Sequence, residues 1–318
     1  MIADEFGEPE VMRLVQQALP AVGSDDVVIR VEAVGVNYAD VLMRRGTYRR
    51  DQELPLTPGV EVVGRLEESL PGLGAGTRVA AFLAGGGGYA DRVVAPRRSV
   101  WPLRDDVDST DAVAVLIQGL TASFALHRFG EVAAGDWVLV HAAAGGVGGL
   151  AVQLAKLAGA HVVATASSER KAAAAAELGT DAAIVADPDT LAERVTAATG
   201  GERCRVVVDG VGGALFDPSF AVLAAHGRYV VVGAAGREPS LLDVRRLMPR
   251  NQQVAGFILA RVLERHPEEP LATFDRLLGL VHDGRLRTRV ATLPLEQAAA
   301  AHWALEARDV IGKLVLVP

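Results

Sequence analysis

The stretch VLVHAAAGGVGGLAVQLAK, from Val138 to Lys156, decides the fold. An apolar strand pattern runs straight into a cluster of alanines and glycines, and a helical pattern follows without a spacer. Residues 143–148 (AAGGVG) fit A-x-G-x-x-G, a variant of the dinucleotide-binding fingerprint. Gly145 would let the backbone approach a pyrophosphate closely, and Gly148 would let the helix pack tightly on the strand. The free N–H groups at the helix start would face the anion.

The chain around this turn alternates short apolar runs with helical patterns. The expected strands are WVLVHA (137–142), HVVATA (161–166), DAAIVA (181–186), RVVVDG (205–210), RYVVVGA (228–234) and QVAGFI (253–258). Strands this continuously apolar are buried on both faces, and the helices between them favour parallel pairing. Six such strands predict a doubly wound parallel sheet. A tight turn without a ligand would also explain the glycines, but this context favours a bound dinucleotide.

The flanking segments follow a different pattern. Expected strands at 27–36, 60–68 and 78–83, with one short helix at 39–45, indicate a mostly antiparallel, barrel-like domain. The final strand, GKLVLVP (312–318), has no sheet of its own, so we expect it to return to that first domain. The predicted organisation is a catalytic domain over 1–118, a dinucleotide-binding domain over 119–258, and a segment over 259–318 that returns to the catalytic domain.

The composition excludes several classes of function. The chain has 318 residues, 22% of them charged, and a formal net charge of -7, so nothing indicates a nucleic-acid or membrane-surface partner. The opening MIADEFGEPE lacks the basic beginning of a signal peptide, which makes the cytoplasm the expected location. The one cysteine, Cys204, lies in an apolar strand pattern, which favours an inert core thiol over a nucleophile. No two histidines have the spacing of a helical metal pair.

The choice of cofactor depends on the end of the second strand. An NAD-selective site usually places an acid there, whereas ATASSERK (164–171) has Ser167 and Ser168, followed by Arg170 and Lys171. Hydroxyl donors and two cations suit the 2′-phosphate of NADP. The alternative is that Ser168 only caps the next helix and that the cations are solvated.

With these residues in view, the chain resembles the zinc-independent medium-chain reductases of the quinone oxidoreductase (zeta-crystallin-like) family. The motifs that carry the resemblance are VGVNYADVLMRRGTY (34–48), LPLTPGVEVVG (54–64), IQGLTAS (117–123), HAAAGGVG (141–148), DGVGG (209–213) and IGKLVLVP (311–318). Enoyl reductase domains of polyketide synthases share much of this pattern. The resemblance implies an α/β chain with a GroES-like, mostly antiparallel catalytic domain and a Rossmann domain. It also implies NADP as cofactor and a homodimer that pairs the sixth strand.

The resemblance further implies a set of cofactor contacts. Asn37 would contact the nicotinamide ribose region, Thr121 would line the cofactor cleft, and Val211, Gly233 and Phe257 would pack around the ribose and nicotinamide. The pyrophosphate would meet Gly145, Gly146 and Val147, beside Ala144. The adenosine phosphate would meet Ser167 and Lys171, to which the residue pattern above adds Ser168 and Arg170. Lys313 would close over the cofactor, and Tyr48 would lie beside the nicotinamide. Relatives often have a tyrosine after the third strand, where this chain has Ala186, so the phosphate depends more on Arg170 and Lys171.

The zinc-dependent relatives provide a check on the mechanism. They have a cysteine two residues after the matching asparagine and a histidine before a matching glutamate. Here those positions are Ala39 and Val60, the latter beside Glu61. The sequence therefore predicts a metal-free reaction and argues against a zinc alcohol dehydrogenase.

Without a metal, the acceptor must already be electrophilic, such as a quinone or an α,β-unsaturated carbonyl. Positioning would supply most of the rate, and a donor aimed at the carbonyl oxygen would help. Tyr48 would donate that hydrogen bond; the alternative is that its ring is only an apolar wall of the pocket. Asn37 would contact the nicotinamide ribose; the alternative is that its amide holds a turn. We expect Asp40 to pair with Arg44 one helical turn away, and Glu61 to be a buried polar anchor.

Three classes of function remain open from the sequence. The first is an NADPH-dependent quinone or enone reductase. One version of it is a stand-alone enoyl-thioester reductase, for which Arg44, Arg45, Arg49 and Arg50 would form a basic entrance for a carrier; the alternative is that these arginines are a solvated face. The second is a protein that binds NADPH without turnover. The third is a zinc alcohol dehydrogenase, which the missing ligands disfavour and a metal analysis would test.

Overall fold

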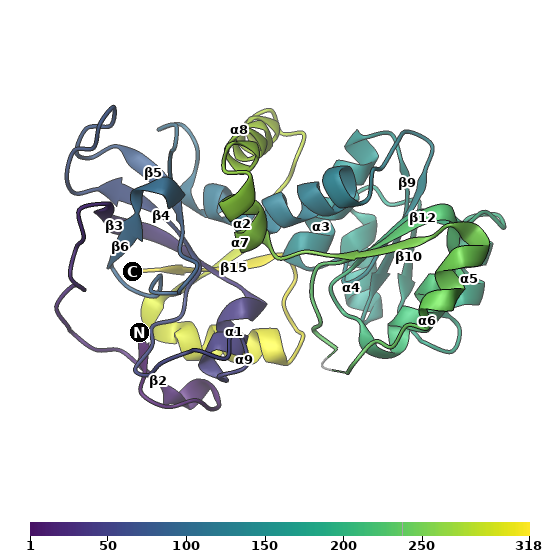
Figure 1. The fold of residues 1–318 in the computed structure, drawn as a ribbon, viewed down its shortest axis with the longest axis horizontal. Helices are drawn as coiled ribbons and strands as arrows, with labels where there is room; N and C mark the ends of the chain where they lie inside the picture. Colours follow the sequence, from purple (N-terminus) through teal and green to yellow (C-terminus); the bar gives the residue numbers. More distant parts are fainter. Residues whose placement is uncertain (237) are drawn as a thin grey trace. The chain divides into compact units, whose positions relative to one another are not determined.

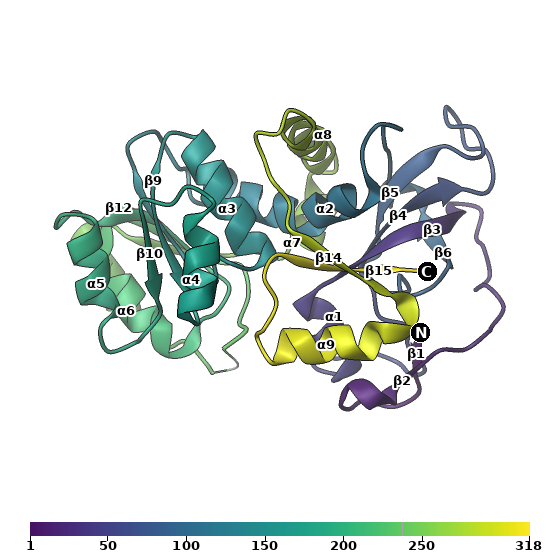
Figure 2. The same cartoon turned by 180° about the vertical axis from the view of Figure 1, so that it is seen from behind.

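The computed structural model describes residues 1–236 and 238–318. The chain divides into two units by its contacts. Unit 1 comprises Met1–Ile117, Leu278–Asp283 and Thr288–Pro318, and unit 2 comprises Gln118–Leu277 and Gly284–Arg287. Figures 1 and 2 show unit 1 built from both the purple start and the yellow end of the chain. The domain boundaries expected from the sequence, after residues 118 and 258, remain a prediction.

Unit 2 contains the predicted parallel sheet. Its strands are β8 (Trp137–Val140), β9 (His161–Ala166), β10 (Ala182–Val185), β11 (Cys204–Asp209), β12 (Leu223–Val231) and β13 (Gln253–Gly256). Their order is β10-β9-β8-β11-β12-β13, and every neighbouring pair is parallel. The doubly wound Rossmann fold is thus confirmed. From β8 the chain first adds β9 and β10 on one side and then β11, β12 and β13 on the other side. The order of strands therefore reverses at β8, and such a switch point is where this fold binds nucleotides.

Helices flank this sheet on both faces (Figures 1 and 2). They are α3 (Gly146–Leu157), α4 (Glu169–Ala176), α5 (Leu191–Ala198) and α6 (Phe216–Ala221), with the short 3-10 turns η4 (Gly213–Leu215) and η5 (Val244–Arg250) in the same segment. Helices α7 (Leu259–Arg265) and α8 (Glu268–His282) follow the sheet in the chain. Fully buried Leu139, Val163 and Val207 come from three neighbouring strands and form the centre of the unit 2 core. This burial explains why the strands read as unbroken apolar runs.

One long helical segment leads into unit 2. Helix α2 (Ser109–Ser123) continues as η3 (Phe124–Phe129), a π-helical segment. By length and composition, Ser109–Phe129 resembles a membrane span, but most of it is buried inside the protein. A mostly buried apolar helix is typical of a protein core, so this feature is weak evidence for a membrane.

Unit 1 contains a mostly antiparallel sheet, as predicted. Its elements are β1 (Ile2–Ala3), η1 (Pro9–Val11), β2 (Met12–Arg13), β3 (Asp26–Val36), α1 (Tyr38–Arg44), β4 (Glu61–Leu66), β5 (Arg78–Phe82), β6 (Arg92–Pro96), η2 (Arg97–Ser99), β7 (Val100–Pro102), β14 (Val290–Pro294), η6 (Leu295–Gln297), α9 (Ala298–Glu306) and β15 (Lys313–Val317). The main sheet has the order β14-β15-β3-β4-β5-β7, and β6 also pairs with β3. Among the described strand pairs of this sheet, β14 and β15 are parallel and all the others are antiparallel.

The pairing of β15 with β3 positions the candidate site of unit 1. These strands are antiparallel, and Leu314 lies opposite Val36 while Val315 lies opposite Gly35. The figures show the yellow strand β15 beside the purple strand β3. Because β3 ends at Val36, this register places Lys313 beside Asn37, the first residue after the strand.

Candidate functional site

The glycine turn connects β8 to α3, and its glycines differ in the space around them. A Cβ on Gly148 would lie 2.4 Å from the carbonyl oxygen of Ala142, closer than real Cβ atoms approach backbone. The nearest atom to a Cβ on Gly145 would be 3.3 Å away. Gly148 is therefore required for packing of the helix on the turn. A Cβ on Gly145 would be tight against one carbonyl oxygen, that of Ala142, but less crowded than one on Gly148. Without a side chain, Gly145 would let a ligand approach its backbone closely.

Gln118 is a neighbour of this turn that the sequence did not single out. Its side-chain amide lies against Gly146, where a Cβ would come within 1.6 Å of Oε1. Gln118 precedes the GLT motif, which includes the half-buried Thr121 on α2. A polar residue beside that motif, on a largely apolar helix, was the available signal. Gly145, Gly146 and Val147 are partly exposed, while Ala144 is buried.

The end of β9 carries the residues expected to select NADP. Ser168 caps α4, because its Oγ accepts a hydrogen bond from Lys171 N at 3.4 Å. Ser168 thus caps the helix, which was one of the two interpretations of the sequence. Its contact with a cofactor phosphate remains a prediction. Ser167 and Arg170 are exposed, and Lys171 is half-buried, so all three are accessible to a ligand.

The turn after β11 is fixed by one carboxylate. Asp209 accepts hydrogen bonds from Val211 N at 2.7 Å and from Gly212 N, and the hydroxyl of Tyr229 donates to it at 2.6 Å. A Cβ on Gly233 would lie 3.2 Å from the oxygen of Gly210, so the turns after β11 and β12 lie close together. These contacts bring the predicted residues Val211 and Gly233 to the same edge of the sheet.

Two further contacts shape this edge. His141, directly after β8, bonds Thr165 Oγ1 at 2.8 Å and Ser219 Oγ at 2.7 Å, and so ties β8 to β9 and α6. Burial lowers the pKa of His141, which keeps the ring neutral. Phe257, expected at the nicotinamide, stacks on Phe129 with ring centroids 4.5 Å apart.

Unit 1 brings three of the noted polar residues into one buried cluster. Asn37 Nδ2 donates to Glu61 Oε1 at 2.8 Å, and Lys313 Nζ donates to Asn37 Oδ1 at 2.8 Å and to Glu61. The other carboxylate oxygen of Glu61 accepts from Ile117 N at 2.8 Å. Asn37 is 7% exposed, Lys313 2% and Glu61 fully buried. The expectation that Glu61 is a buried polar anchor is therefore confirmed.

The cluster connects four motifs that lie far apart in the sequence. Glu61 contacts the segments NYAD, IQGLT and IGKL, and it lies itself in GVE. Both ends of the Asn37 amide have charged partners, which fixes its orientation. Lys313 is committed to this cluster, so its direct contact with a cofactor remains a prediction. The signal in the sequence for this cluster was an acid and a lysine within two apolar strand patterns, because charges that are buried there must be paired.

Asp40 does not pair with Arg44, contrary to the expectation from helical spacing. Its carboxylate accepts from Asn37 N at 2.7 Å and Gly59 N at 3.0 Å, and Tyr89 Oη lies 3.4 Å away. As the third residue of α1, Asp40 turns back to cap the helix start, which leaves it out of reach of the following turn. Burial raises the pKa of Asp40 to about 7.

The arginines around Tyr48 are not a free basic patch. Arg44 is fully buried and pairs with Glu306, which also pairs with Arg45. Arg49 pairs with Asp51 at 2.8 Å, and Arg50 is exposed. Three of the four charges thus have acidic partners, which weakens the case for a carrier entrance.

Tyr48 is half-buried. Burial and then the negative charge of Asp40 raise the pKa of its hydroxyl. It therefore stays protonated at neutral pH and is able to donate a hydrogen bond.

The positions that hold zinc ligands in related enzymes lack donor atoms here. Ala39 and Val60 carry only hydrocarbon side chains. Across residues 1–236 and 238–318, no group of three or more His, Cys, Asp or Glu side chains is placed to hold a metal ion. Cys204 is buried, and burial raises the pKa of its thiol to about 12, as expected for an inert core cysteine.

A Rossmann sheet with a glycine turn at its switch point, joined in one chain to a GroES-like sheet, defines a medium-chain dehydrogenase or reductase. The comparisons with known proteins agree. Residues 23–105 match the profile of the alcohol dehydrogenase GroES-like domain, and residues 146–275 match that of the zinc-binding dehydrogenases.

Three relatives make the assignment more specific. A quinone oxidoreductase of Pseudomonas aeruginosa is 33% identical, over 98% of this chain and 97% of the relative. A 2-haloacrylate reductase of a Burkholderia species is 32% identical, over 93% and 92% of the two chains. A mycobacterial protein solved in complex with NADPH has a TM-score of 0.91 and 35% identity, over 100% and 99% of the two chains. The chain belongs to the quinone oxidoreductase family of medium-chain dehydrogenases and reductases.

Proposed function

We propose that this oxidoreductase transfers a hydride from NADPH to a quinone or an α,β-unsaturated carbonyl without a metal ion. The observation that carries the proposal is the glycine turn at the sheet's switch point, with Arg170 and Lys171 in the first turn of α4, the helix that follows the adjacent strand β9. Gly145 fits the group, because it is partly exposed and has no side chain between a ligand and its backbone, while Gly148 is packed against the turn. When bound, NADPH supplies the hydride.

The residues of unit 2 would bind the cofactor in three groups. The pyrophosphate would rest on Ala144, Gly145, Gly146 and Val147; the adenosine phosphate would meet Ser167, Ser168, Arg170 and Lys171; the nicotinamide half would meet Thr121, Val211, Gly233 and Phe257. The Asp209 carboxylate and His141 hold the turns that present these residues.

The residues of unit 1 would act on the nicotinamide end and on the acceptor. Glu61 and Lys313 orient the Asn37 amide, which would hold the nicotinamide ribose. Tyr48, protonated at neutral pH, would donate a hydrogen bond to the acceptor oxygen where negative charge develops. Because Ala39 and Val60 offer no metal ligand, polarisation of the acceptor depends on such donors. This favours acceptors that are already electron-poor.

The acceptor and the cofactor preference are tested together. Purified protein is assayed for consumption of NADPH and of NADH, with benzoquinone, a medium-chain 2-enal and an enoyl thioester in parallel, after metal analysis. Turnover of NADPH with benzoquinone or the enal, by protein free of zinc, is expected. Turnover of the thioester alone would favour the enoyl-thioester alternative. Saturable NADPH binding without turnover of any acceptor would contradict the proposal and favour a binding protein.

The cofactor preference has a matched test. The double variant Arg170→Ala/Lys171→Ala should raise the KM for NADPH about tenfold or more, since charge-assisted bonds to a phosphate are lost, and leave that for NADH nearly unchanged. Lys156→Ala is the control, because Lys156 lies at the C-terminal end of α3, the end opposite the glycine turn, and pairs with Asp181. Equal effects of the double variant on both cofactors would refute the assigned phosphate site.

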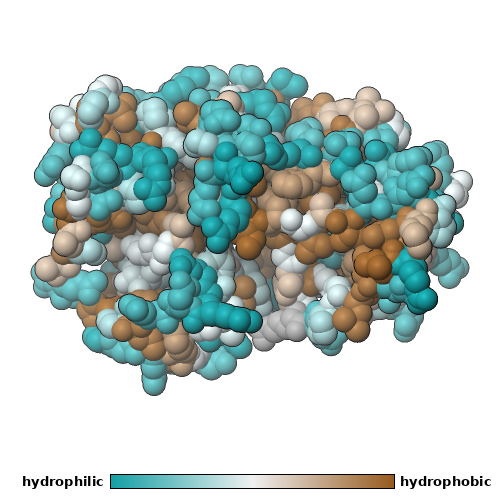
Figure 3. Space-filling model, viewed as in Figure 1, coloured by the Kyte–Doolittle hydropathy of each residue, from teal (hydrophilic) through white to brown (hydrophobic). Residues whose placement is uncertain are grey.

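We also propose a homodimer formed through β13. This strand is the last of the unit 2 sheet, and among residues 1–236 and 238–318 it pairs only with β12, which leaves its other edge without a neighbouring strand. Exposed Leu241, Val244 and Met248 precede it, and Figure 3 shows apolar surface gathered over unit 2 on this face. Sedimentation analysis should give twice the chain mass; a monomer at micromolar concentration would refute this. The cytoplasmic location expected from the sequence remains a prediction.

A further inference from the structure

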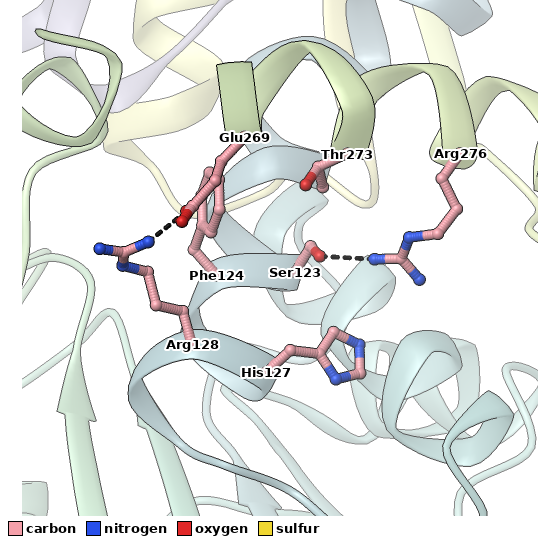
Figure 4. A pocket seen from close by; sticks show the side chains of 7 residues that line it. All are labelled: Ser123, Phe124, His127, Arg128, Glu269, Thr273 and Arg276. Atoms are coloured by element: carbon pink, nitrogen blue, oxygen red, sulfur yellow. Dashed lines mark hydrogen bonds and ion pairs between the residues drawn. The ribbon is translucent and has the colours of Figure 1, made fainter. Parts of the chain in front are cut away.

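A cavity of about 430 Å³ lies in unit 2 between two helical segments (Figure 4). One wall is the junction of α2 and η3, and the other is α8. The lining residues are Ser123, Phe124, His127 and Arg128 from the first wall and Glu269, Thr273 and Arg276 from the second. Residues three or four positions apart lie on one face of a helix. The lining residues of each wall follow this spacing, so they form two helix surfaces that face each other across the cavity. None of them belongs to the proposed cofactor or acceptor site.

The charges of the cavity are unevenly paired. Arg128 forms an ion pair with Glu269, so these two charges cancel. Arg276 has only a hydroxyl partner, donating from Nη2 to Ser123 Oγ at 2.9 Å. No carboxylate of the described chain lies within ion-pair distance of Arg276. The cavity therefore has one uncompensated positive charge.

His127 lies beside this charge. Figure 4 shows its ring on the same side of the cavity as Arg276, with Ser123 near both. Partial burial and then the positive charge of Arg276 lower the pKa of His127. Arg128 and Glu269 are the other charged groups that line the cavity. A neutral imidazole next to an unpaired guanidinium leaves hydrogen-bond capacity for an anion.

We propose that this cavity binds a small monocarboxylate with an apolar body. The guanidinium fork of Arg276 matches the two oxygens of a carboxylate, and the hydroxyls of Ser123 and Thr273 can donate to it. The ring of Phe124 supplies an apolar wall for the hydrocarbon part. The single uncompensated positive charge of Arg276 balances a monoanion, whereas the second charge of a phosphate dianion would have no counter-charge in the cavity.

The test uses benzoate as the probe and the full-length chain. Ligand-observed NMR at low ionic strength measures benzoate binding, with inorganic phosphate in a parallel arm and with NADPH present and absent. Arg276→Gln keeps a hydrogen-bond donor but removes the charge, and it should weaken benzoate binding about tenfold or more. Arg261→Gln is the control, since Arg261 is exposed on α7 of the same unit.

A second readout reports on the geometry. Bound benzoate should raise the pKa of His127, measured from its ring proton shifts, and Arg276→Gln should abolish that change. Saturable binding that is unaffected by NADPH, lost in Arg276→Gln and retained in Arg261→Gln is the expected result. Absence of saturable binding would overturn the proposal. So would equal binding by Arg276→Gln, displacement of benzoate by NADPH, or tighter binding of phosphate.

Discussion

Gly145 and Gly148 share one motif but meet different surroundings. A Cβ at Gly145 would meet one backbone atom, the carbonyl oxygen of Ala142 at 3.3 Å, while several backbone atoms of the 142–143 segment surround the place of a Cβ at Gly148. A motif of glycines therefore combines two requirements, one for a ligand and one for the fold. The sequence pattern cannot separate them, but substitution by alanine can.

Gly148→Ala should destabilise the protein by about 1–3 kcal/mol, because the new methyl group has no space between helix and turn. Gly145→Ala should destabilise the protein less than Gly148→Ala, because its methyl group would be less crowded, yet it should raise the Kd for NADPH about tenfold or more, since the methyl group would occupy the place of the pyrophosphate. Urea denaturation and cofactor titration measure the two effects. Unchanged NADPH affinity in Gly145→Ala would contradict the proposed site.

His302 predicts how stability depends on pH. It is fully buried, with Nε2 2.9 Å from Tyr89 Oη, and burial together with the charge of Arg44 lowers its pKa to about 3. A histidine in the unfolded chain has a pKa of about 6.5, so between these values the unfolded state binds more protons. The contribution of His302 to the free energy of unfolding is complete above about pH 6.5 and should fall by up to about 1.4 kcal/mol per pH unit below it.

Urea denaturation of the wild type and of His302→Asn between pH 4 and 8 checks this expectation. The free energy difference between the two proteins should shrink on acidification, because the variant lacks the titrating ring. His226→Asn, at an exposed position, is the control for replacing a histidine by asparagine. A pH-independent difference for His302→Asn would contradict the assigned cause. Asp40, whose pKa is raised, acts in the opposite direction and is common to both proteins.

Helices α1 and α9 are joined by a buried ion pair. Arg44 on α1 is fully buried and donates to Glu306 on α9 at 2.8 Å, and its Nε and Nη1 have no hydrogen-bond partner among the described residues. The cost of burying this guanidinium is thus offset mainly by one carboxylate. Such pairs cost more to break than they contribute over an apolar replacement.

Glu306→Leu should therefore destabilise the protein by about 3–5 kcal/mol, since Arg44 would be left buried without a counter-charge. The double variant Arg44→Met/Glu306→Leu should recover most of that loss. Arg49→Met is the surface control, as Arg49 pairs with the exposed Asp51, and it should have an effect below about 1 kcal/mol. Additive effects in the double variant would show that the two side chains are not coupled.

At the scale of elements, the sequence predicted what is locally encoded. The strand at 161–166 agrees with β9 at both ends, because buried parallel strands are unbroken apolar runs. Helices α2 and α9 were not assigned, since alanine-rich and apolar segments carry little periodic contrast. The pairing of Asp40 with Arg44 was wrong because helical spacing does not include partners from elsewhere in the chain. For the same reason, the Glu61 cluster became visible only in the folded structure.

At the scale of the molecule, the last strand completes the first sheet. β15 lies between β14 and β3 and contributes Lys313 to the cluster with Asn37 and Glu61. Unit 2 takes nearly all of its residues from one continuous segment, Gln118–Leu277. The two units therefore differ in how much of the chain they need before they can form.

Deletion of residues 313–318 should unfold unit 1 and leave the parallel sheet of unit 2 folded. Calorimetry should lose one unfolding transition, turnover should be abolished, and saturable NADPH binding should persist at reduced affinity. Deletion of Pro318 alone is the control and should leave both transitions in place. Loss of all structure in the longer deletion would show that unit 2 depends on unit 1.

The same topology has a consequence during synthesis on the ribosome. Val34, Gly35 and Val36 are translated about 280 residues before their partners Leu314, Val315 and Leu316. At about 5–20 residues per second, this edge of β3 would wait roughly 15–55 s for its neighbour. An unpaired apolar strand edge is a template for aggregation during that interval. Newly made chains should therefore need a chaperone until their final residues leave the ribosome, although the finished protein no longer exposes this edge.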